Sequence, residues 1–173
     1  MPPLLESARL ILRPRQLADV ESYVAMDGDP EVRRYLPPDF RDNFDAETYR
    51  RILPSRMAVD FGDGLGHWSL WLKQDPAVFA GTALLIPVDG RGPEIEIGWR
   101  LPRRLWGKGY AGEAAETVMR HARGVIGERD LVALIHPDNA GSIGVARKIG
   151  FARAGQRDAY GTCFDLYRPG ENS

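Results

Sequence analysis

The sequence predicts a single α/β domain with a mixed sheet, and two patterns point to that class. Short apolar runs of strand length, such as residues 131–135, recur along the chain, and segments with helical spacing lie between them. A chain of 173 residues is close to the size of one domain. We see no repeat or linker that divides it. We therefore expect one domain over residues 1–173, with its core over about 7–168.

The first predicted elements are a strand and two helical segments. The strand covers residues 10–12 and is closed by Pro14, which cannot donate to a sheet ladder. A helix is expected over 17–26, with Asp19 in its first turn, where a carboxylate is favourable. Residues 29–35 then restart a helical turn with a proline near its start.

The next segment predicts a longer helix between breaking residues. Pro37 and Pro38 end the preceding turn. A helix is predicted over 45–61 because its large side chains recur at helical spacing. These side chains are Tyr49, Ile52, Leu53, Met57 and Phe61. Pro54 predicts a kink or an early end of this helix, and the glycine-rich residues 62–66 form a turn.

Strands dominate the middle of the chain. Residues 68–73 and 80–86 are predicted strands joined by a hairpin turn at 74–76. Pro93 marks the start of a third strand over 94–101. A helix follows from 111 to about 125–127, because its small and apolar side chains share one helical face. That face consists of Ala111, Ala114, Ala115, Val118, Met119 and Ala122.

The last third of the chain predicts three strands and one helix. Residues 131–135 form a continuous apolar run, which is typical of a buried central strand. A short helix over 140–148 ends at Gly150, a residue suited to a C-cap. Residues 151–156 and 163–168 are the closing strands, and the tail after them is expected to fray.

The run from Arg104 to Ala111 predicts a binding site for a diphosphate. Gly107 and Gly109 precede the amphipathic helix, and a helix start leaves several backbone N–H groups without acceptors. Glycine lets an oxyanion approach these groups, and the helix dipole favours negative charge there. The loop is not a P-loop, and although residues 107–112 satisfy the string G-x-G-x-x-G, no βαβ unit with a following acidic residue supports a dinucleotide site.

This loop carries a family resemblance. The pattern Arg104-x-x-Gly107-x-Gly109 resembles the Arg/Gln-x-x-Gly-x-Gly/Ala acetyl-CoA signature of the GCN5-related N-acetyltransferase (GNAT) superfamily. Residues 7–14, Ser-Ala-Arg-Leu-Ile-Leu-Arg-Pro, resemble the opening strand of its RimJ/RimL-like branch. Residues 94–101 resemble the strand before the loop. Residues 136–151 resemble the family segment N-x-x-S…K-x-G-F, with Asn139, Ser142 and Lys148-x-Gly150-Phe151.

The resemblance implies a fold and a co-substrate. The fold would be a mixed, mostly antiparallel sheet of about six to seven strands flanked by about four helices. A bulge in strand 94–101 would split it from the next central strand, and the pantetheine arm of acetyl-CoA would enter that gap. Backbone groups of Trp99, Arg100 and Leu101 would bind the arm. The diphosphate would bind the loop residues Arg104, Leu105, Trp106, Gly107, Lys108, Gly109, Tyr110 and Ala111.

Further roles follow from the same resemblance. The N–H of Ile97 would stabilise an oxyanion, and Asn139 would lie close to the pantetheine, although an asparagine there is also an ordinary N-cap. Many GNAT enzymes place a tyrosine that protonates the leaving thiolate where this chain has Ala146. Ser142, one turn earlier on the same helix face, is the candidate donor in its place.

A general base is expected because a protein α-amine has a pKa near about 8 and is mostly charged at neutral pH. Glu96 is the first candidate and Glu94 the second, since alternation puts both on one strand face, where two carboxylates raise each other's pKa. Either residue could instead bind the positive amine or an arginine. His67 is a weaker candidate base.

Composition limits the other classes. A single cysteine, Cys163, excludes an internal disulfide and suggests the cytoplasm. A net charge of −1 gives no overall basic field, so no direct binding of nucleic acid is expected. Cys163 is expected to pack in a terminal strand rather than carry an acyl group. No apolar run approaches the ~20 residues of a membrane span, no secretory signal is visible, and no histidine or cysteine pair has metal-ligand spacing. A homodimer, common in the resembling branch, is left open.

The sequence therefore predicts an N-acetyltransferase that uses acetyl-CoA on a primary amine, either a protein N-terminus or a small molecule, by direct attack in a ternary complex. Residues 37–43 and 62–66 are expected to frame the acceptor pocket. One alternative is a non-catalytic acyl-CoA-binding or sensing module, motivated by Ala146. Another is an α/β protein that uses the loop for ATP.

Overall fold

The computed structural model describes residues 1–125 and 131–170. Within them, one eight-stranded sheet has the order β1-β2-β3-β4-β5-β6-β8-β7. The strands are β1 (Leu5–Glu6), β2 (Leu10–Pro14), β3 (Gly66–Leu72), β4 (Asp75–Pro87), β5 (Ile95–Arg100), β6 (Leu131–Ile135), β7 (Phe151–Ala159) and β8 (Thr162–Pro169). The α-helices are α1 (Val20–Asp27), α2 (Pro30–Arg33), α3 (Pro38–Asp42), α4 (Ala46–Met57), α5 (Tyr110–Val125) and α6 (Ala140–Lys148).

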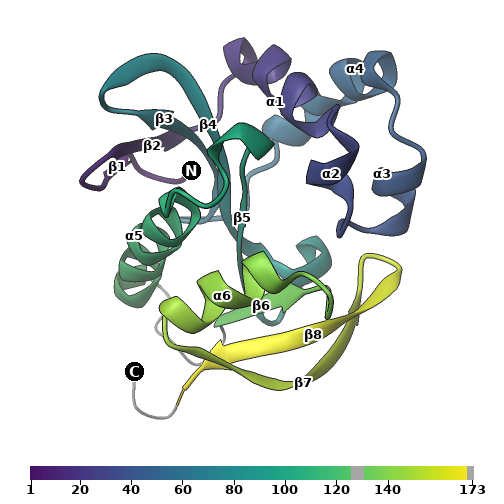
Figure 1. Ribbon diagram of the computed structural model, residues 1–173, viewed down its shortest axis with the longest axis vertical. Coiled ribbons are helices and arrows are strands. Elements are labelled where there is room, and N and C mark those ends of the chain that lie inside the picture. Colours follow the sequence, from purple (N-terminus) through teal and green to yellow (C-terminus); the bar gives the residue numbers. More distant parts are fainter. Residues whose placement is uncertain (126–130, 171–173) are drawn as a thin grey trace.

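The helices lie in two groups on either side of the sheet. Figure 1 shows α5 and α6 apart from α1–α4, which gather at the upper right. The largest core joins α5 and α6 to the strands, and a second core joins α1, α2 and α4 to Trp71 and Phe79. Both groups are held by buried apolar area, at roughly 25 cal/mol per Å² removed from water.

The predicted face of α5 is confirmed. Its apolar positions from Ala114 to Ala122 are buried against the sheet, and Ala111 packs at the edge of the same core. The predicted end of this helix near 125–127 lies partly outside the described residues, since α5 is described as far as Val125. The buried strand 131–135 is confirmed as β6.

The split between the central strands is also present. The parallel strands β5 and β6 pair only at Ile95 with Leu131 and at Glu96 with Val132. Beyond Glu96 the β6-facing edge of β5 pairs with no described strand. The predicted bulge in β5 is wrong: β5 pairs with β4 without a shift from Ile95 to Arg100. The irregularities lie instead between β3 and β4, at Leu70–Leu72, and between β7 and β8, at Arg153–Gly155.

Several predicted boundaries change for local reasons. The described residues hold more helices and strands than predicted, because β1 and α3 are too short to give a periodic signal, whereas α2 lies within the helical turn predicted over 29–35. Pro38 begins α3 rather than only breaking the chain, since a first helical residue needs no N–H donor. The helix predicted to reach residue 61 ends at Met57, one turn after Pro54. The β3–β4 turn lies at residues 73–74, so β4 starts earlier than predicted.

Gly81 fixes the contact between β4 and the end of β5. Its φ is +128°, and a Cβ there would overlap the carbonyl oxygen of Arg100 and lie 2.9 Å from Leu101 Cα. We expect Gly81→Ala to lower the free energy of unfolding by on the order of 3 kcal/mol, from backbone strain and overpacking together. Urea unfolding measures this change.

The control is Gly124→Ala, at an exposed position of α5 where a Cβ meets nothing within 4 Å. Alanine favours a helix interior over glycine by roughly 1 kcal/mol, so this variant should gain stability. Equal stability of Gly81→Ala and the wild type would show that the backbone contact with β5 is not fixed.

Candidate active site

A cavity of about 710 Å³ opens where β5 leaves β6. Its floor is the sheet face that carries Leu84, Ile86 and Glu96, and residues 133–136 of β6 and the following turn line its other side. Helices α3 and α4 contribute to its roof. Its volume lies within the roughly 300–1,000 Å³ of small-molecule sites.

The loop before α5 presents unpaired backbone donors. The backbone N–H groups of residues 107–112 donate to no acceptor within the described part of the chain, whereas the N–H of Glu113 already bonds the carbonyl of Gly109. Gly107 and Gly109 have φ of 72° and 81°, a left-handed conformation that favours glycine. Because a helix N-terminus with free amides attracts oxyanions, this loop fits a diphosphate.

Arg9 holds this loop from the neighbouring strand segment. Its side chain donates to the carbonyl of Lys108 (3.0 Å) and to the carboxylate of Glu113 (2.6 Å). The guanidinium also lies 4.4 Å from the ring centroid of Tyr110. Ser7 donates to the same carboxylate at 2.6 Å, so the N-terminal segment fixes the first turn of α5.

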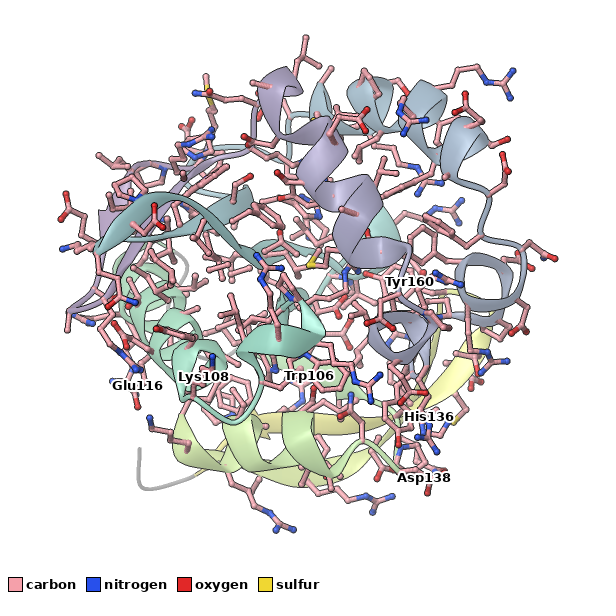
Figure 2. The ribbon with its side chains drawn as sticks, turned by 45° about the horizontal axis from the view of Figure 1, so that its top comes forward. Trp106, Lys108, Glu116, His136, Asp138 and Tyr160 are labelled. Atoms are coloured by element: carbon pink, nitrogen blue, oxygen red, sulfur yellow. The ribbon has the colours of Figure 1, made fainter. Side chains whose placement is uncertain are left out.

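The loop residues before Gly107 pack against or bond other parts of the protein. Leu105 is buried, and Arg104 donates to the carbonyl of Phe79 at 3.2 Å. The indole N–H of Trp106 donates to the carbonyl of Leu101 (2.8 Å). The Leu101 carbonyl, which was predicted to bind the pantetheine arm, therefore already has one hydrogen-bond partner. Figure 2 shows Lys108 and Trp106 near the start of α5, and Tyr160 and His136 on the opposite side of the view.

The strand residues predicted to bind pantetheine lie along the cavity. Ile97, Trp99 and Arg100 line it, whereas Leu101 does not. The side chain of Arg100 points to a different partner, because its Nε lies 2.8 Å from a carboxylate oxygen of the fully buried Asp27. Burial opposes the charge of Arg100, but Asp27 keeps the pKa of Arg100 above its usual value.

The start of α6 brings two further predicted residues to the cavity. Asn139 is the N-cap, with its side-chain oxygen accepting the N–H of Ser142 at 3.1 Å, and both residues line the cavity. The ordinary N-cap role of Asn139 is therefore real. Ala146 is fully buried, and its methyl side chain brings no polar group to the site.

Glu96 is the titratable group at the centre of the site. Burial raises the pKa of Glu96 to about 7, against a hydrogen bond from the Tyr160 hydroxyl, which favours the charged form. The Tyr160 hydroxyl donates to Glu96 Oε2 at 2.5 Å. The sequence predicted that a second carboxylate, Glu94, raises the pKa of Glu96, and this cause is wrong. Burial is the largest cause of the raised pKa, and the carboxylate that repels the charge of Glu96 is Asp89.

Tyr160 was not predicted. It lies with Gly161 in the tight turn between β7 and β8, where both residues have positive φ. Its backbone N–H donates to Asp89 at 2.7 Å, which anchors the turn to the loop after β4. The dipeptide Tyr160-Gly161 between two strands is a hairpin signal. Its contact with Glu96, far away in the sequence, has no such signal.

Glu94 is engaged elsewhere. Its carboxylate oxygens lie 3.1 Å from Arg157 and 3.6 Å from Arg168. Glu94 does not line the cavity. Of the two carboxylates predicted on this strand, the structure places only Glu96 in the cavity and pairs Glu94 with arginines.

The three histidines and the cysteine have distinct surroundings. His67 lines the cavity, and His136 lines it while stacking on Tyr35 at 5.2 Å between ring centroids. His121 bonds the carbonyl of Gly64 at 2.8 Å. Cys163 lies in the terminal strand β8, as predicted, and its side chain is exposed there.

Across residues 1–125 and 131–170, no three histidine, cysteine or acidic side chains gather in a way that could hold a metal ion. None of the helices in these ranges has the length and apolar character to cross a membrane.

Comparisons with known proteins agree on one family. Residues 9–152 match the model described as the acetyltransferase (GNAT) domain. A Bacillus licheniformis protein named uncharacterized N-acetyltransferase p20 is 27% identical over 167 residues, which cover 94% of this chain and 92% of that protein.

Solved structures share the fold. An acetyltransferase from Agrobacterium tumefaciens str. C58 has a TM-score of 0.79 and 24% identity, covering 99% of this chain and 96% of that one. RimL, a ribosomal L7/L12 alpha-N-protein acetyltransferase in complex with coenzyme A, has a TM-score of 0.73 and 18% identity, covering 95% and 94%.

Proposed function

Since the chain belongs to the acetyltransferase (GNAT) domain family, we propose that it transfers the acetyl group of acetyl-CoA to a primary amine by direct attack in a ternary complex. The observation that carries this proposal is the cavity beside the divergence of β5 and β6, with the partly buried carboxylate of Glu96 on its floor. A carboxylate whose pKa is about 7 can accept a proton at neutral pH.

The chain's own groups support binding of acetyl-CoA. The unpaired N–H groups of residues 107–112 suit the diphosphate, and the edge of β5 from Ile97 to Arg100 suits the amides of the pantetheine arm. Bound acetyl-CoA supplies an activated acetyl group as a thioester. The likeness to RimL in complex with coenzyme A is in keeping with this co-substrate.

The roles of individual residues follow from their places. Glu96 removes the proton of the incoming amine, and Tyr160 holds the Glu96 carboxylate at 2.5 Å. The N–H of Ile97 is proposed to stabilise the developing oxyanion. Ser142, which lines the cavity, is proposed to donate a proton to the departing thiolate. Glu94 has a structural role in this proposal, as the partner of Arg157 and Arg168.

Activity is tested by incubating the protein with acetyl-CoA and a panel of amines while CoA release is followed. The panel contains peptide N-termini and small amines, because the acceptor is not fixed by the fold. We expect release above background with at least one of them. Background release with every amine would contradict the proposal.

A thermal-shift comparison of CoA, ATP–Mg²⁺ and NAD tests the choice of co-substrate independently of the acceptor. We expect CoA to stabilise the fold, since a ligand that binds only the folded state raises the melting temperature. Stabilisation by ATP–Mg²⁺ without stabilisation by CoA would mean that the loop serves a nucleotide.

The domain organisation, family branch and location belong to the same proposal. One continuous sheet supports a single N-acetyltransferase domain over residues 1–173. The RimJ/RimL-like branch and the cytoplasmic location stay predictions.

Tyr160→Phe should change the pH dependence of transfer. The lost hydroxyl favoured the charged carboxylate, so without it the pKa of Glu96 rises further. The acidic limb of the kcat/KM profile should therefore move to higher pH, with transfer several-fold lower at pH 7 and a smaller deficit at pH 9. The profile is measured from pH 5 to 9. A limb at the wild-type position would contradict this role for Tyr160.

A further inference from the structure

The end of the cavity that lies away from the β5–β6 divergence is positively charged. Arg15 follows β2 and His67 lies in β3, and both line the cavity. In the sheet order these strands lie on the far side of β4 from the divergence. Arg56, in the last turn of α4, lines the same end.

Arg15 has no acidic partner within residues 1–125 and 131–170. Its side chain donates one hydrogen bond, to the carbonyl of Arg56 at 2.6 Å. Two other partly buried arginines beside the sheet differ, since Arg13 pairs with Asp19 and Arg100 pairs with Asp27. Burial lowers the pKa of Arg15, and Arg100 and Arg56 repel its charge.

His67 adds a polar group without a partner. Its Nδ1 is buried and makes no hydrogen bond within the described ranges. Burial, followed by the charges of Arg15 and Arg100, holds the pKa of His67 well below its usual value. The imidazole is therefore neutral near pH 7 and can donate one N–H to a ligand.

The acidic side chains of the cavity lie elsewhere. Asp45 is the N-cap of α4, where its carboxylate accepts the N–H of Thr48 at 2.8 Å. Arg56 is at the other end of that helix. At 1.5 Å per helical residue the two are on the order of 16 Å apart. Asp39 is in α3, and Glu96 is on β5. None of these carboxylates makes an ion pair with Arg15.

We propose that Arg15, Arg56 and His67 form an anion subsite, which binds a carboxylate or phosphate group carried by the amine acceptor. This inference rests on the proposed function, since it treats the cavity as the acceptor site. A guanidinium and an imidazole N–H are suited to such a group through charge-assisted hydrogen bonds.

The sheet register sets the distance between the two ends. His67 pairs with Leu84, which pairs with Gly98, two residues beyond Glu96. With strands about 4.8 Å apart and about 3.3 Å per residue, the Cα atoms of Glu96 and His67 are on the order of 12 Å apart. The acceptor is therefore extended, with its amine and its anion at opposite ends. An α-amino acid, whose two groups are adjacent, does not fit this description.

Two matched pairs of acceptors test the subsite. One pair is 8-aminooctanoate and 8-aminooctanamide, and the other is the tripeptide amides Ser-Ala-Glu and Ser-Ala-Gln. The measured quantity is the ratio of kcat/KM for the anionic member over the neutral member. We expect a ratio of about ten or more in the wild type for at least one pair, as a charged hydrogen bond allows. The pair that shows it distinguishes a small-molecule from a peptide acceptor.

Variants separate binding from folding. Arg15→Gln should bring the ratio to about one, and Arg56→Gln, which keeps the backbone carbonyl that Arg15 bonds, should lower it partly. Arg51→Gln is the matched control, because Arg51 is an exposed residue of α4 that does not line the cavity. A purely structural role of Arg15 would lower both members of a pair equally and leave the ratio unchanged.

A wild-type ratio near one for both pairs, or a ratio that Arg15→Gln does not change, would overturn the subsite while leaving the proposed function in place. Absence of transfer with every amine would instead contradict the proposed function. The subsite is then decided by calorimetry with N-acetyl-8-aminooctanoate and its amide. Tighter binding of the carboxylate, lost in Arg15→Gln, supports it, and equal binding overturns it.

Discussion

Glu96→Gln should lower kcat/KM for acetyl transfer by about 100-fold or more, the usual loss when a general base is removed. Glutamine keeps the shape of the side chain and can still accept from Tyr160, but it cannot take a proton from the amine. In the wild type, kcat/KM should rise with pH through about 7, the pKa of Glu96. The variant should lack this limb.

Two controls accompany this variant. The affinity for CoA should be nearly unchanged, because the proposed role of Glu96 is to take a proton from the amine and not to bind CoA. Glu94→Gln should keep the limb near pH 7, since Glu94 pairs with Arg157 and Arg168 outside the cavity. A limb near 7 that persists in Glu96→Gln and disappears in Glu94→Gln would reverse the assignment of the base.

The same carboxylate links stability to pH. Its pKa is raised by burial in the folded state, so its contribution to stability is full below the unfolded pKa of about 4.5 and is lost as pH rises through about 7. Glu96→Gln removes this loss. Relative to the wild type, the variant should therefore be more stable at pH 8 than at pH 5 in thermal unfolding.

The second large effect is expected in the loop before α5. The double variant Gly107→Ala with Gly109→Ala should weaken CoA binding by about 10- to 100-fold. Alanine in the left-handed conformation costs roughly 1–2 kcal/mol per residue, so the loop should leave the geometry that aims its N–H groups. A Cβ at Gly109 would also come within 3.3 Å of the Arg9 guanidinium. Calorimetry with CoA measures the change.

Gly62→Ala is the control for backbone strain alone. Gly62 has a φ of +101° and open space at its Cβ position, and it lies outside the loop and the cavity. This variant should bind CoA like the wild type. Unchanged affinity in the double glycine variant would show that the loop does not hold the co-substrate.

Local patterns predicted the parts of the fold that depend on local sequence. The buried face of α5 follows from residue spacing, and β6 follows from a continuous apolar run. The free N–H groups of the loop follow from two glycines before a helix. Two-residue β1 and the short α3 could not be predicted from periodicity, because they have so few residues, whereas the proline near its start predicted the helical turn that forms α2.

The contacts that tune the site are long-range, and the sequence does not contain them in readable form. Tyr160 reaches Glu96 only because the β7–β8 hairpin folds against the loop at Asp89. The side chain of Arg100 pairs with Asp27 of α1, a contact that no local pattern predicted, whereas the prediction for Arg100 concerned its backbone groups. The raised pKa of Glu96 comes mainly from burial, which depends on the whole cavity rather than on a neighbouring residue in the chain.

Amide proton and nitrogen NMR spectra, recorded while CoA is added, test the central claim at single residues. The claim is that the backbone N–H groups of residues 107–112, which have no acceptor among residues 1–125 and 131–170, bind the diphosphate. We expect saturable downfield shifts of the Gly107 and Gly109 amides, with changes also along Ile97–Arg100. CoA binding that leaves the amides of residues 107–112 unshifted, or no binding at all, would contradict the claim.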